Sequence, residues 1–475
     1  MEDAIIIGAG AVGAFVARNL SRYELNVLVL EAQNDVGDVT SMANSAIVHS
    51  GYDPVPGTKK AYFNVRGNAL FPKLCEELDI EFEQNGSLTV ALDDKQFAML
   101  PPLEERAKQN GVETRLVLHD ELLKMEPNVN PEAKGALYCP SAGIVNPFTL
   151  VAHTFENALD NGVKLRLGEK VVGISEKDGV YTVKTEKGEY QAKMVIDCAG
   201  LHSEEIAKMV EDVPWTINPR KGEYYVLDHF APNFVHSVLF PLPSEKGKGI
   251  LFSRTTSGNY IVGPSSEPDP DKEDFSTDAA TLKNIKEQAT GMVPGIPFRE
   301  QIRVFAGLRS TPSTHDFIIE PLPNHPGFIC VAGIESPGLV SSPAIGQYVA
   351  DELVAPYLKA VQKANWNPRI RPHVRLASLS IEERNALIKK NPHYGLMVCN
   401  CEKVSLGELE DELTRSLPCL TVKAMKKRTR AGFGKCQGGF CQPKVLMLLA
   451  KAGHKSPTEV PYDRPGSEIL EGRSK

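Results

Sequence analysis

The sequence predicts an α/β fold built around a parallel sheet, and three separated segments support this prediction. The chain begins with an apolar strand at Ala4–Ile7, a glycine-rich turn, a helical segment at Ala14–Leu20 and a second apolar run at Asn26–Leu30. A strand that leads into a helix and then into another strand is typical of parallel sheets. Apolar strands that end in glycine before a helix recur at Lys193–Gly200 and Gly327–Gly346. The sheet is therefore expected to combine three distant parts of the chain.

The turn after the first strand has the spacing of a dinucleotide-binding motif. Gly8, Gly10 and Gly13 fill the glycine positions of G-x-G-x-x-G, and Glu31 ends the second strand. The first glycine makes the turn, the second admits a pyrophosphate close to the backbone, and the third lets helix and strand approach. The terminal acid can accept a hydrogen bond from a ribose hydroxyl, and it disfavours a 2′-phosphate. The motif predicts a discontinuous, Rossmann-like domain that binds FAD or NAD.

Length, charge and composition exclude several classes of function. The chain has 475 residues, a formal net charge of −7 and a sequence pI near 6.0, so it has no general attraction for nucleic acid or for an anionic membrane. No segment is apolar over the length of a membrane span, and the N-terminus passes directly into the first strand. We therefore expect a cytoplasmic protein of two or three domains. The nine cysteines favour metal or redox chemistry over a disulfide framework.

The segments between the three nucleotide-binding parts are predicted to form a mixed sheet that covers the bound nucleotide. Strand-like runs occur at Glu223–Leu227, Gly249–Ser253 and Asn259–Gly263. Substrate is expected between the two layers. The expected pieces are about 1–85, 145–214 and 318–358 for the nucleotide-binding domain, and about 86–144 and 215–317 for the substrate domain.

Several longer motifs resemble one group of flavoenzymes. The run N-S-A-I-V-H-S-G-Y-D-P at Asn44–Pro54 resembles the glycerol-3-phosphate oxidases and dehydrogenases and the L-2-hydroxyglutarate dehydrogenases, and the order of segments resembles the D-amino-acid-oxidase-type FAD superfamily. Further matching motifs lie at Gly247–Ile250, Asn259–Pro264, Phe305–Arg309, Asp316–Glu320 and Ser336–Leu339. The resemblance implies FAD rather than NAD. Because no second glycine motif is visible for a nicotinamide, electrons are expected to leave by another route.

The resemblance also suggests which residues contact FAD. The polar loop after Glu31 is expected to lie against the flat cofactor. A helix that starts near Ser341-Ser342-Pro343 would direct its N-terminus at the reduced, negatively charged ring. The candidate FAD contacts are Gly8, Gly10, Gly13, Glu31, Ser41, Asn44, Ser45, Gly200, Gly333, Gly338 and Leu339.

His49 is the candidate base for oxidation of a secondary alcohol. With a flavin, this reaction removes the hydroxyl proton while hydride moves from carbon to the cofactor. Histidine titrates near neutral pH, and His49 lies in the loop that is expected to face the ring. The alternative is that His49 only hydrogen-bonds the loop or the flavin.

An anionic substrate would require fixed cations, and Arg309 is the leading candidate. A guanidinium can bind a carboxylate or a phosphate through two hydrogen bonds. Lys248, between two glycines, could add a point charge to the catalytic set, although a lysine in such a turn is usually solvated. Ser336 could donate to the substrate or to the flavin edge, or could serve only the turn before Pro337. His315 has a weaker claim than His49.

A second group of motifs lies beyond a predicted linker or strap at residues 359–394. Cys399 and Cys401 form C-N-C, and Cys436 and Cys441 form C-Q-G-G-F-C. Structural zinc usually uses C-x-x-C spacing, which neither pair has, so zinc is the less favoured alternative. The run R-T-R-A-G-F-G-K-C-Q-G-G-F-C resembles the bacterioferritin-associated-ferredoxin-like domain of some glycerol-3-phosphate dehydrogenases. This resemblance implies a [2Fe–2S] cluster held by the four cysteines within residues 395–455, followed by a polar tail at 456–475. The other cysteines are expected to be core thiols: Cys75, Cys139, Cys198, Cys330 and Cys419.

Six cations crowd the sequence near the second cysteine pair: Lys423, Lys426, Lys427, Arg428, Arg430 and Lys435. They could offset the negative charge of a thiolate-bound cluster, dock an acidic electron carrier, or merely form a solvated helix face. Nucleic-acid binding is disfavoured because aromatic interleaving is absent.

Together these features predict an FAD-dependent oxidoreductase domain at residues 1–358 that oxidises sn-glycerol 3-phosphate to dihydroxyacetone phosphate. Electrons would pass from FAD through the [2Fe–2S] cluster to an electron-accepting protein or companion subunit. The nearest alternative substrate is L-2-hydroxyglutarate, and an amine or imino acid is a third. In a hypothesis of another class, the C-terminal module is only a docking or cluster-binding element of a complex that catalyses elsewhere.

Overall fold

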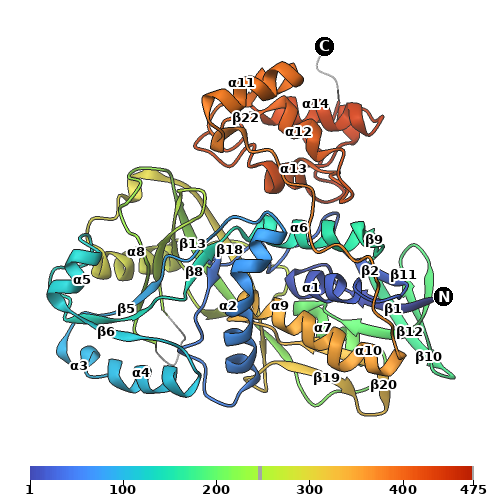
Figure 1. Cartoon of the computed structure of the whole chain (residues 1–475), viewed down its shortest axis with the longest axis horizontal. Coiled ribbons are helices and arrows are strands. Elements are labelled where there is room, and N and C mark those ends of the chain that lie inside the picture. Colours follow the sequence, from blue (N-terminus) through green and yellow to red (C-terminus); the bar gives the residue numbers. More distant parts are fainter. Residues whose placement is uncertain (244–248, 473–475) are drawn as a thin grey trace.

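Two sheets form the body of the molecule, and a smaller helical lobe stands above it (Figure 1). This computed structural model describes residues 1–243 and 249–472. An extended strap leaves the body after α10 (Ala355–Leu358) and leads into the lobe, which is orange to red in Figure 1. The α/β body with its two sheets and the small helical C-terminal part confirm the predicted fold class.

The first sheet combines the three distant segments that the sequence predicted. β1 (Glu2–Ile7) lies parallel to β2 (Val27–Glu31) on one side and to β12 (Glu189–Asp197) on the other. On the side away from β1, the first half of β12 pairs with antiparallel β11 (Val180–Thr185). The second half of β12 pairs with parallel β20 (His325–Ala332). The remaining strands of this sheet are β9 (Lys164–Leu167), β10 (Val171–Lys177) and β19 (Ile318–Leu322). Ala4, Ile5 and Ile6 of β1 are fully buried, because helices cover both faces of this sheet.

Four helices pack together beside the nucleotide-binding motif. α1 (Ala11–Leu20) follows the glycine turn and contacts α6 (Pro147–Asp160) and α9 (Gly338–Tyr348), while α2 (Lys59–Glu77) packs on α9. α9 continues through a π-helical turn at Val349–Val354 into α10, and α7 (Ser203–Lys208) follows β12. This packing fixes the helix N-termini that face the space between the sheets.

The prediction that the helix near residue 341 starts at Ser341-Ser342-Pro343 was wrong. α9 begins at Gly338, so Pro343 lies inside the helix. Proline has no N–H to donate to the carbonyl of Leu339, and the hydroxyl of Ser342 donates to that carbonyl instead, at 2.7 Å. The Ser342 hydroxyl thus replaces the backbone hydrogen bond that Pro343 cannot make. The helix can therefore begin before the proline.

The second sheet is mixed, as predicted, and runs in the order β17, β13, β16, β15, β14, β5, β7, β6, with β18 on the other side of β13. The β14–β5 pair is parallel, whereas its neighbours are antiparallel. Its strands are β5 (Ser87–Ala91), β6 (Arg115–Leu118), β7 (Gly135–Cys139), β13 (Ile217–Leu227), β14 (Val238–Pro241), β15 (Leu251–Arg254), β16 (Tyr260–Gly263), β17 (Glu267–Pro268) and β18 (Gln301–Pro312). Helices α3 (Asp94–Phe97), α4 (Leu100–Gln109), α5 (His119–Met125) and α8 (Ala279–Met292) accompany it.

A third, small sheet has three strands. β8 (Gly143–Val145) pairs with β3 (Ile47–Val48) and with β4 (Phe82–Glu83). Since β3 immediately precedes His49, this sheet fixes the position of the loop that carries the candidate base.

The C-terminal lobe has its own apolar core. It contains α11 (Ile381–Lys390), β21 (Met397–Cys399), β22 (Val404–Ser405), α12 (Leu406–Glu412), α13 (Val422–Thr429) and α14 (Gln442–Ala452). Leu409, Met425 and Val445 are buried together with further residues from these helices. Ser405 forms a capping box with Glu408 at the start of α12, and Thr421 caps α13. Val460 and Tyr462 also pack in this core, so the end of the chain returns to the lobe.

The strap is bound to the body along its length. The indole N–H of Trp366 donates to the hydroxyl of Ser21 at 3.0 Å, and Arg375 forms ion pairs with Asp79 at 3.0 Å and Glu81 at 2.8 Å. These contacts join the end of α1, the segment after α2 and the strap. The strap therefore acts as a fastened connection between body and lobe.

Within residues 1–243 and 249–472, no helix combines the length and the apolar character that crossing a membrane requires.

Candidate active site and cluster site

A cavity of about 1060 Å³ lies between the two large sheets. Ile7 and Gly8 line it from the nucleotide-binding sheet, and Tyr224, Phe240 and Arg309 line it from the mixed sheet. The candidate residues that reach this cavity are Gly8, Gly10, Glu31, Ser41, Asn44, Ser45, His49, Gly200, Arg309, His315, Ser336, Gly338 and Leu339. Sequence positions up to 330 residues apart thus meet in one space.

The glycine turn has the close approaches that a dinucleotide cradle requires. A Cβ on Gly8 would lie 2.5 Å from the carbonyl oxygen of Cys198, and Gly8 has a φ of +102°. A Cβ on Gly13 would lie 2.1 Å from the carbonyl oxygen of Gly8. Gly13 does not line the cavity, and its lack of a side chain instead lets α1 approach the turn. Gly333 also lies outside the cavity lining, beside Pro312.

Glu31 holds the turn and faces the cavity. Its carboxylate accepts from the N–H of Ala9 at 2.6 Å and from the N–H of Gln33 at 2.8 Å. Burial raises the pKa of Glu31, and these two hydrogen bonds oppose that rise. A buried carboxylate at the end of β2 suits a ribose hydroxyl, so the residues fit the adenosine half of FAD.

The loop after β2 is organised by its own polar side chains. Ser41 accepts a hydrogen bond from the N–H of Ala11 at 2.9 Å, at the start of α1. Asn44 donates to the carbonyl of Ser41 at 2.7 Å and accepts from the N–H of Ala46 at 2.8 Å. Ser45 contacts the Tyr224 hydroxyl at 3.2 Å. The loop therefore presents a fixed polar wall without regular secondary structure, as the sequence predicted.

Arg309 carries a buried donor without a protein partner in the described part of the chain. Its Nη2 donates to the carbonyl of Ser265 at 3.0 Å, whereas Nη1 is buried and has no hydrogen-bond acceptor among the described residues. Gly222 makes room for the guanidinium, because a Cβ there would lie 2.7 Å from Nη2. A buried charge without a partner is costly, so this donor suits an anionic group that enters the cavity.

His49 reaches the same cavity from the loop after β3. Its ring lies 5.7 Å from the Phe240 ring, and its backbone carbonyl accepts from the side-chain amide of Asn64 at 2.7 Å. The amide of Asn68 donates to the same carbonyl at 3.2 Å. Two amides from α2 thus position the backbone of the candidate base.

Ser336 and the start of α9 line the cavity on the side of β20. Gly338 and Leu339 form the first turn of α9, while Ser341 and Ser342 are fully buried and lie outside the cavity lining. The positive end of α9 therefore faces the cavity, although three residues earlier than the sequence suggested. Lys248 lies outside the described residues.

Tyr224 is a cavity residue that the sequence reasoning missed. Its ring stacks on Phe305 with centroids 4.6 Å apart, and burial raises the pKa of its hydroxyl. Its hydroxyl lies 3.2 Å from the hydroxyl of Ser45, and the positive charge of Arg309 opposes the rise in its pKa. Alternation within the predicted strand at Glu223–Leu227 could have placed it on the inner face, but not beside Arg309, which lies on another strand.

The four candidate metal-ligating cysteines form two neighbouring pairs in the lobe. The sulfur atoms of Cys401 and Cys436 lie 3.7 Å apart, and Cys399 and Cys441 share a hydrogen bond. This bond lowers the pKa of Cys399 to about 6, with help from the backbone N–H groups of Glu402 and Gly432. Among residues 1–243 and 249–472, no three His, Cys, Asp or Glu side chains converge tightly enough to bind one metal ion. Two thiol pairs suit a two-iron cluster, in which four cysteine thiolates are the ligands, better than a single tetrahedral zinc.

Bare backbone surrounds these thiols. A Cβ on Gly434 would lie 2.3 Å from the Cβ of Cys401, so only glycine allows this approach. The N–H groups of Gly438 and Phe440 point to Cys436. Such donors stabilise negatively charged sulfur, and the residues therefore fit a [2Fe–2S] cluster.

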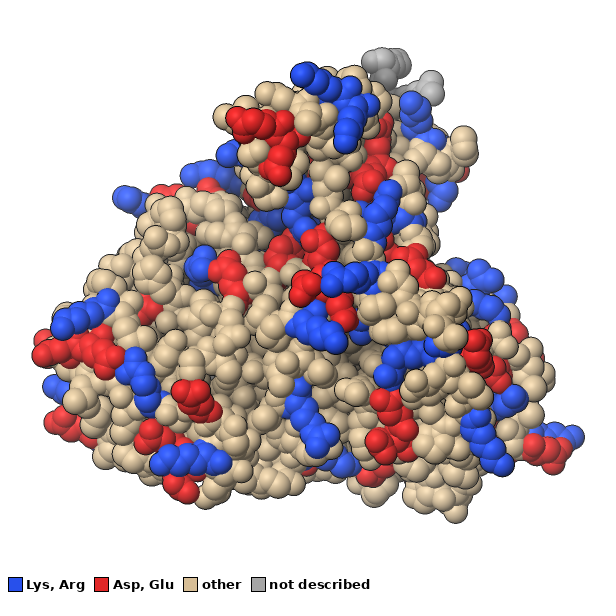
Figure 2. Space-filling view, in the orientation of Figure 1, with Lys and Arg blue, Asp and Glu red and all other residues tan. Residues whose placement is uncertain are grey.

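Most of the cations near the cysteines lie at the junction between the lobe and the body. Lys427 forms ion pairs of 2.7 Å with Asp35 and 2.6 Å with Asp38, and Arg428 pairs with Asp35. Figure 2 shows red and blue side chains gathered along this junction. The prediction of a solvated helix face was therefore wrong for these cations, since ion pairing to the body buries them. Lys426 is also buried, which lowers its pKa to about 8, and its ammonium lies 4.6 Å above the Phe433 ring.

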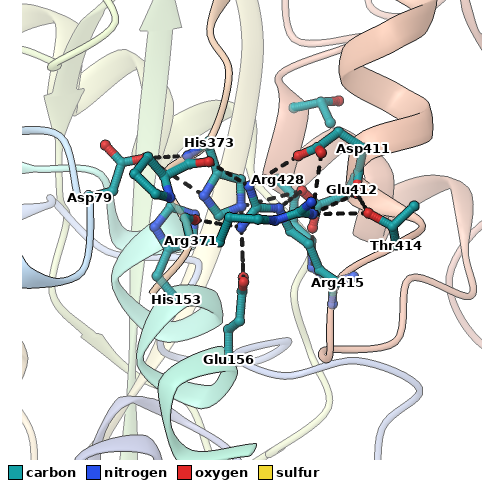
Figure 3. Close-up of polar contacts among 12 residues, drawn as sticks. Asp79, His153, Glu156, Arg371, His373, Asp411, Glu412, Thr414, Arg415 and Arg428 are labelled. Atoms are coloured by element: carbon teal, nitrogen blue, oxygen red, sulfur yellow. Dashed lines mark hydrogen bonds and ion pairs between the residues drawn. The ribbon is translucent and has the colours of Figure 1, made fainter. Parts of the chain in front are cut away.

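A second polar network joins the strap, α6 and α12 (Figure 3). His373 stacks on His153 with ring centroids 4.0 Å apart and contacts Glu412 at 3.4 Å. Arg415 pairs with Glu156 at 2.8 Å. Buried charged residues of the lobe and of the body thus fix the two parts together. The junction also includes the loop that lines the cavity at Gly37 and Asp38.

Comparison with known proteins adds two family matches. Residues 3–352 match the family described as FAD dependent oxidoreductase, and residues 397–451 match the BFD-like [2Fe-2S] binding domain. The two matches fall on the body and on the lobe.

Individual relatives agree with these matches. A glycerol 3-phosphate dehydrogenase of Caloramator mitchellensis is 44% identical over 100% of this chain and 99% of its own length. A solved structure of L-alpha-glycerophosphate oxidase from Mycoplasma pneumoniae with FAD bound has a TM-score of 0.75 and 29% identity, covering 78% of this chain and 99% of that one. An L-2-hydroxyglutarate dehydrogenase of Indibacter alkaliphilus is 32% identical over 55% of this chain and 67% of its own.

Proposed function

We propose that this chain, which belongs to the FAD dependent oxidoreductase family and carries a BFD-like [2Fe-2S] binding domain, oxidises sn-glycerol 3-phosphate to dihydroxyacetone phosphate. The relative from Caloramator mitchellensis supports this substrate, because its similarity extends over both the body and the lobe. The proposal assigns residues 1–358 to the oxidoreductase domain and 395–455 to the cluster domain, and it places the protein in the cytoplasm.

The unpartnered donor of Arg309 is the observation that carries the substrate class. Arg309 would bind the phosphate through Nη1, while the carbonyl of Ser265 holds Nη2 in place. A buried guanidinium pairs with phosphate through charge-assisted hydrogen bonds, which a neutral alcohol such as glycerol lacks. The enzyme is therefore expected to reject glycerol itself.

His49 would accept the proton of the substrate hydroxyl. Bound FAD would supply the hydride acceptor for the carbinol carbon, and a [2Fe–2S] cluster held by the four cysteines would supply a one-electron acceptor. Asn64 and Asn68 hold the backbone of His49 at the cavity. An imidazole is a suitable general base near neutral pH. Ser336 and the start of α9 would orient the cofactor or substrate from the opposite side.

The electrons would leave through the lobe to an electron-accepting protein or companion subunit. The lobe contacts the loop Asp35–Asp38, and Gly37 and Asp38 of this loop line the cavity. The lobe that carries the four cysteines therefore contacts a loop that also lines the cavity. This arrangement supports transfer within the chain over catalysis elsewhere in a complex.

The test is the visible spectrum of the anaerobic holoenzyme with three separate compounds. We expect sn-glycerol 3-phosphate to bleach the flavin rapidly, while L-2-hydroxyglutarate and glycerol leave it oxidised. Bleaching by L-2-hydroxyglutarate alone would overturn the proposed substrate, and bleaching by glycerol would contradict the role of Arg309.

A further inference from the structure

The cluster lobe has two different faces. On the side of the body, α13 carries the buried cations that pair with Asp35 and Asp38. In Figure 1, α13 forms the edge of the lobe next to the body, and α14 lies farther from it. Since α14 begins at Cys441, this helix leads from a cluster ligand to the outer surface.

The outer face carries large apolar side chains that nothing in the described chain covers. Phe440, between the ligands Cys436 and Cys441, is 83% exposed, and Met447 is 57% exposed. The backbone N–H of Phe440 points to the sulfur of Cys436. Aromatic residues and methionine are enriched in interfaces, and exposed apolar patches mark contact sites.

The same face is positively charged. Residues 442–458 include three lysines, Lys444, Lys451 and Lys455, and no Asp or Glu, whereas Lys435 faces the body and pairs with Glu300 at 3.5 Å. Lys444, Met447 and Lys451 follow one another at helical spacing, so they share one side of α14 with Phe440 one turn earlier. Lys444 and Lys451 have no ion pair with any described residue, in contrast to the paired cations of α13. Figure 2 shows acidic side chains elsewhere on the lobe, so the absence of acids is particular to this stretch.

The two thiol pairs differ in exposure. Cys401 is exposed and Cys436 is half-buried, whereas Cys399 and Cys441 are buried. Phe440 follows Cys436 by four residues and directly precedes Cys441, so a protein that binds Phe440 would lie close to two of the cluster ligands. A close approach matters because electrons move between proteins only over short distances.

We propose that Phe440, Lys444, Met447 and Lys451 form the docking surface for an acidic one-electron carrier protein. This inference rests on the proposed function and adds the place and the charge of its acceptor. Each transfer takes one electron from the reduced cluster and reduces one acceptor, without making a bond. One alcohol therefore reduces two acceptors, and its two protons go to solvent.

The test uses one acceptor with two charges, native cytochrome c, which is basic, and succinylated cytochrome c, which is acidic. Holoenzyme is reduced with dithionite, freed of excess reductant and mixed anaerobically with each cytochrome, so that the assay does not depend on the alcohol. We expect the succinylated form to react faster at low ionic strength, and added salt to remove the difference. Binding of the oxidised succinylated cytochrome to immobilised oxidised enzyme provides a readout without turnover.

Charge and apolar variants locate the surface. Lys444→Glu and Lys451→Glu should each slow reduction of the succinylated cytochrome about tenfold and weaken its binding, since steering by charge changes association by such factors. Phe440→Ala should weaken binding by about tenfold at all salt concentrations. Lys95→Glu on α3 and Leu118→Ala, both exposed and on the body, are the matched controls and should change neither readout.

The outcomes separate this inference from the proposed function. If glycerol 3-phosphate fails to bleach the flavin, the proposed function fails, while the dithionite experiment still tests the surface. A preference for native cytochrome c, or an equal effect of Lys95→Glu and Lys444→Glu, would overturn the docking surface alone. Retained cluster absorbance in every variant shows that the lobe is intact.

Discussion

The cavity and the lobe junction both contain cations with buried nitrogen atoms, but they use them in opposite ways. At the junction, Lys427 and Arg428 are paired with the carboxylates of Asp35 and Asp38. In the cavity, Arg309 has one buried donor with no acceptor among the described residues. A paired buried charge fastens two parts of a protein, whereas an unpaired one is a cost that a ligand can remove. The comparison separates structural cations from a binding cation.

The junction should respond most strongly to loss of one partner. Arg428→Met removes one of the two cations that pair with Asp35 and one of the cations beside Glu412, and removal of one partner of a buried pair costs about 3–5 kcal/mol. We expect a lower midpoint of thermal unfolding and easier proteolysis of the lobe. Lys59→Met, which breaks an exposed pair with Glu320, is the control and should cost about 0–1 kcal/mol. Equal stabilities of the two variants would show that the junction charges do not fasten the lobe.

Arg309→Leu should show the reverse pattern. The variant loses the charge that binds the phosphate, so kcat/KM for glycerol 3-phosphate should fall by about 2–5 kcal/mol of binding free energy, roughly 30-fold to several thousand-fold. Stability should be unchanged or slightly higher, because an unpaired buried charge is removed. Steady-state kinetics and thermal unfolding measure the two effects. A strongly destabilised Arg309→Leu with normal kcat/KM would mean that Arg309 is a structural cation.

The histidine pair at the junction gives the comparison a pH dependence. Burial opposes charge on His373, but the carboxylates of Asp79 at 3.7 Å and Glu412 at 3.4 Å outweigh it and raise its pKa. Its stabilising effect is therefore complete below about pH 6.5, the unfolded value, and is lost as pH rises through the folded pKa. Burial and the neighbouring His373 lower the pKa of His153, so its effect is lost as pH falls below about 6.5.

We therefore expect maximal stability near pH 6.5, with slopes of up to about 1.4 kcal/mol per pH unit on either side. His373→Gln should remove the loss on the alkaline side, and His153→Gln the loss on the acid side. Denaturant unfolding at pH values from about 5 to 8.5, the range in which histidine ordinarily titrates, measures the free energy of unfolding of each variant. An unchanged alkaline slope in His373→Gln would contradict the assignment. The other charges around His373 are those of Glu156, Arg375 and Arg415.

The smallest effect is expected at Tyr224. Tyr224→Phe keeps the ring stacked on Phe305 but removes the hydroxyl that contacts Arg309 and Ser45. Loss of such a hydrogen bond costs about 0.5–1.5 kcal/mol, so KM for glycerol 3-phosphate should rise by roughly 2- to 12-fold with little change in kcat. Phe305→Leu serves as the control for the stacking. A large fall in kcat instead would give Tyr224 a direct part in the reaction.

The parts of the fold that depend on local sequence were predictable. The buried strands and the glycine turn followed from Ala4–Gly13, and the second sheet from short alternating runs. Contacts between distant elements were not. Nothing in the order of residues places Tyr224 beside Arg309, or Asp35 beside Arg428, because each pair depends on how two elements pack.

Helix ends and cation roles also depended on tertiary contacts. Pro343 is tolerated inside α9 because Ser342 supplies the missing hydrogen bond, a compensation that proline statistics do not include. The same cation-rich run contains both the junction residue Lys427 and the exposed Lys435, which is 71% exposed. Both lysines pair with carboxylates of the body, but only Lys427 is buried by that contact.

The most direct test of the account follows both redox sites in one experiment. Anaerobic holoenzyme is mixed with glycerol 3-phosphate, and flavin absorbance is recorded together with freeze-quench electron paramagnetic resonance of the cluster. We expect flavin bleaching first, followed by the signal of the reduced [2Fe–2S] cluster, and the rate of cluster reduction should be at least as high as kcat. A flavin that bleaches while the cluster stays oxidised would contradict transfer through the lobe, and a flavin that stays oxidised would contradict the proposed reaction.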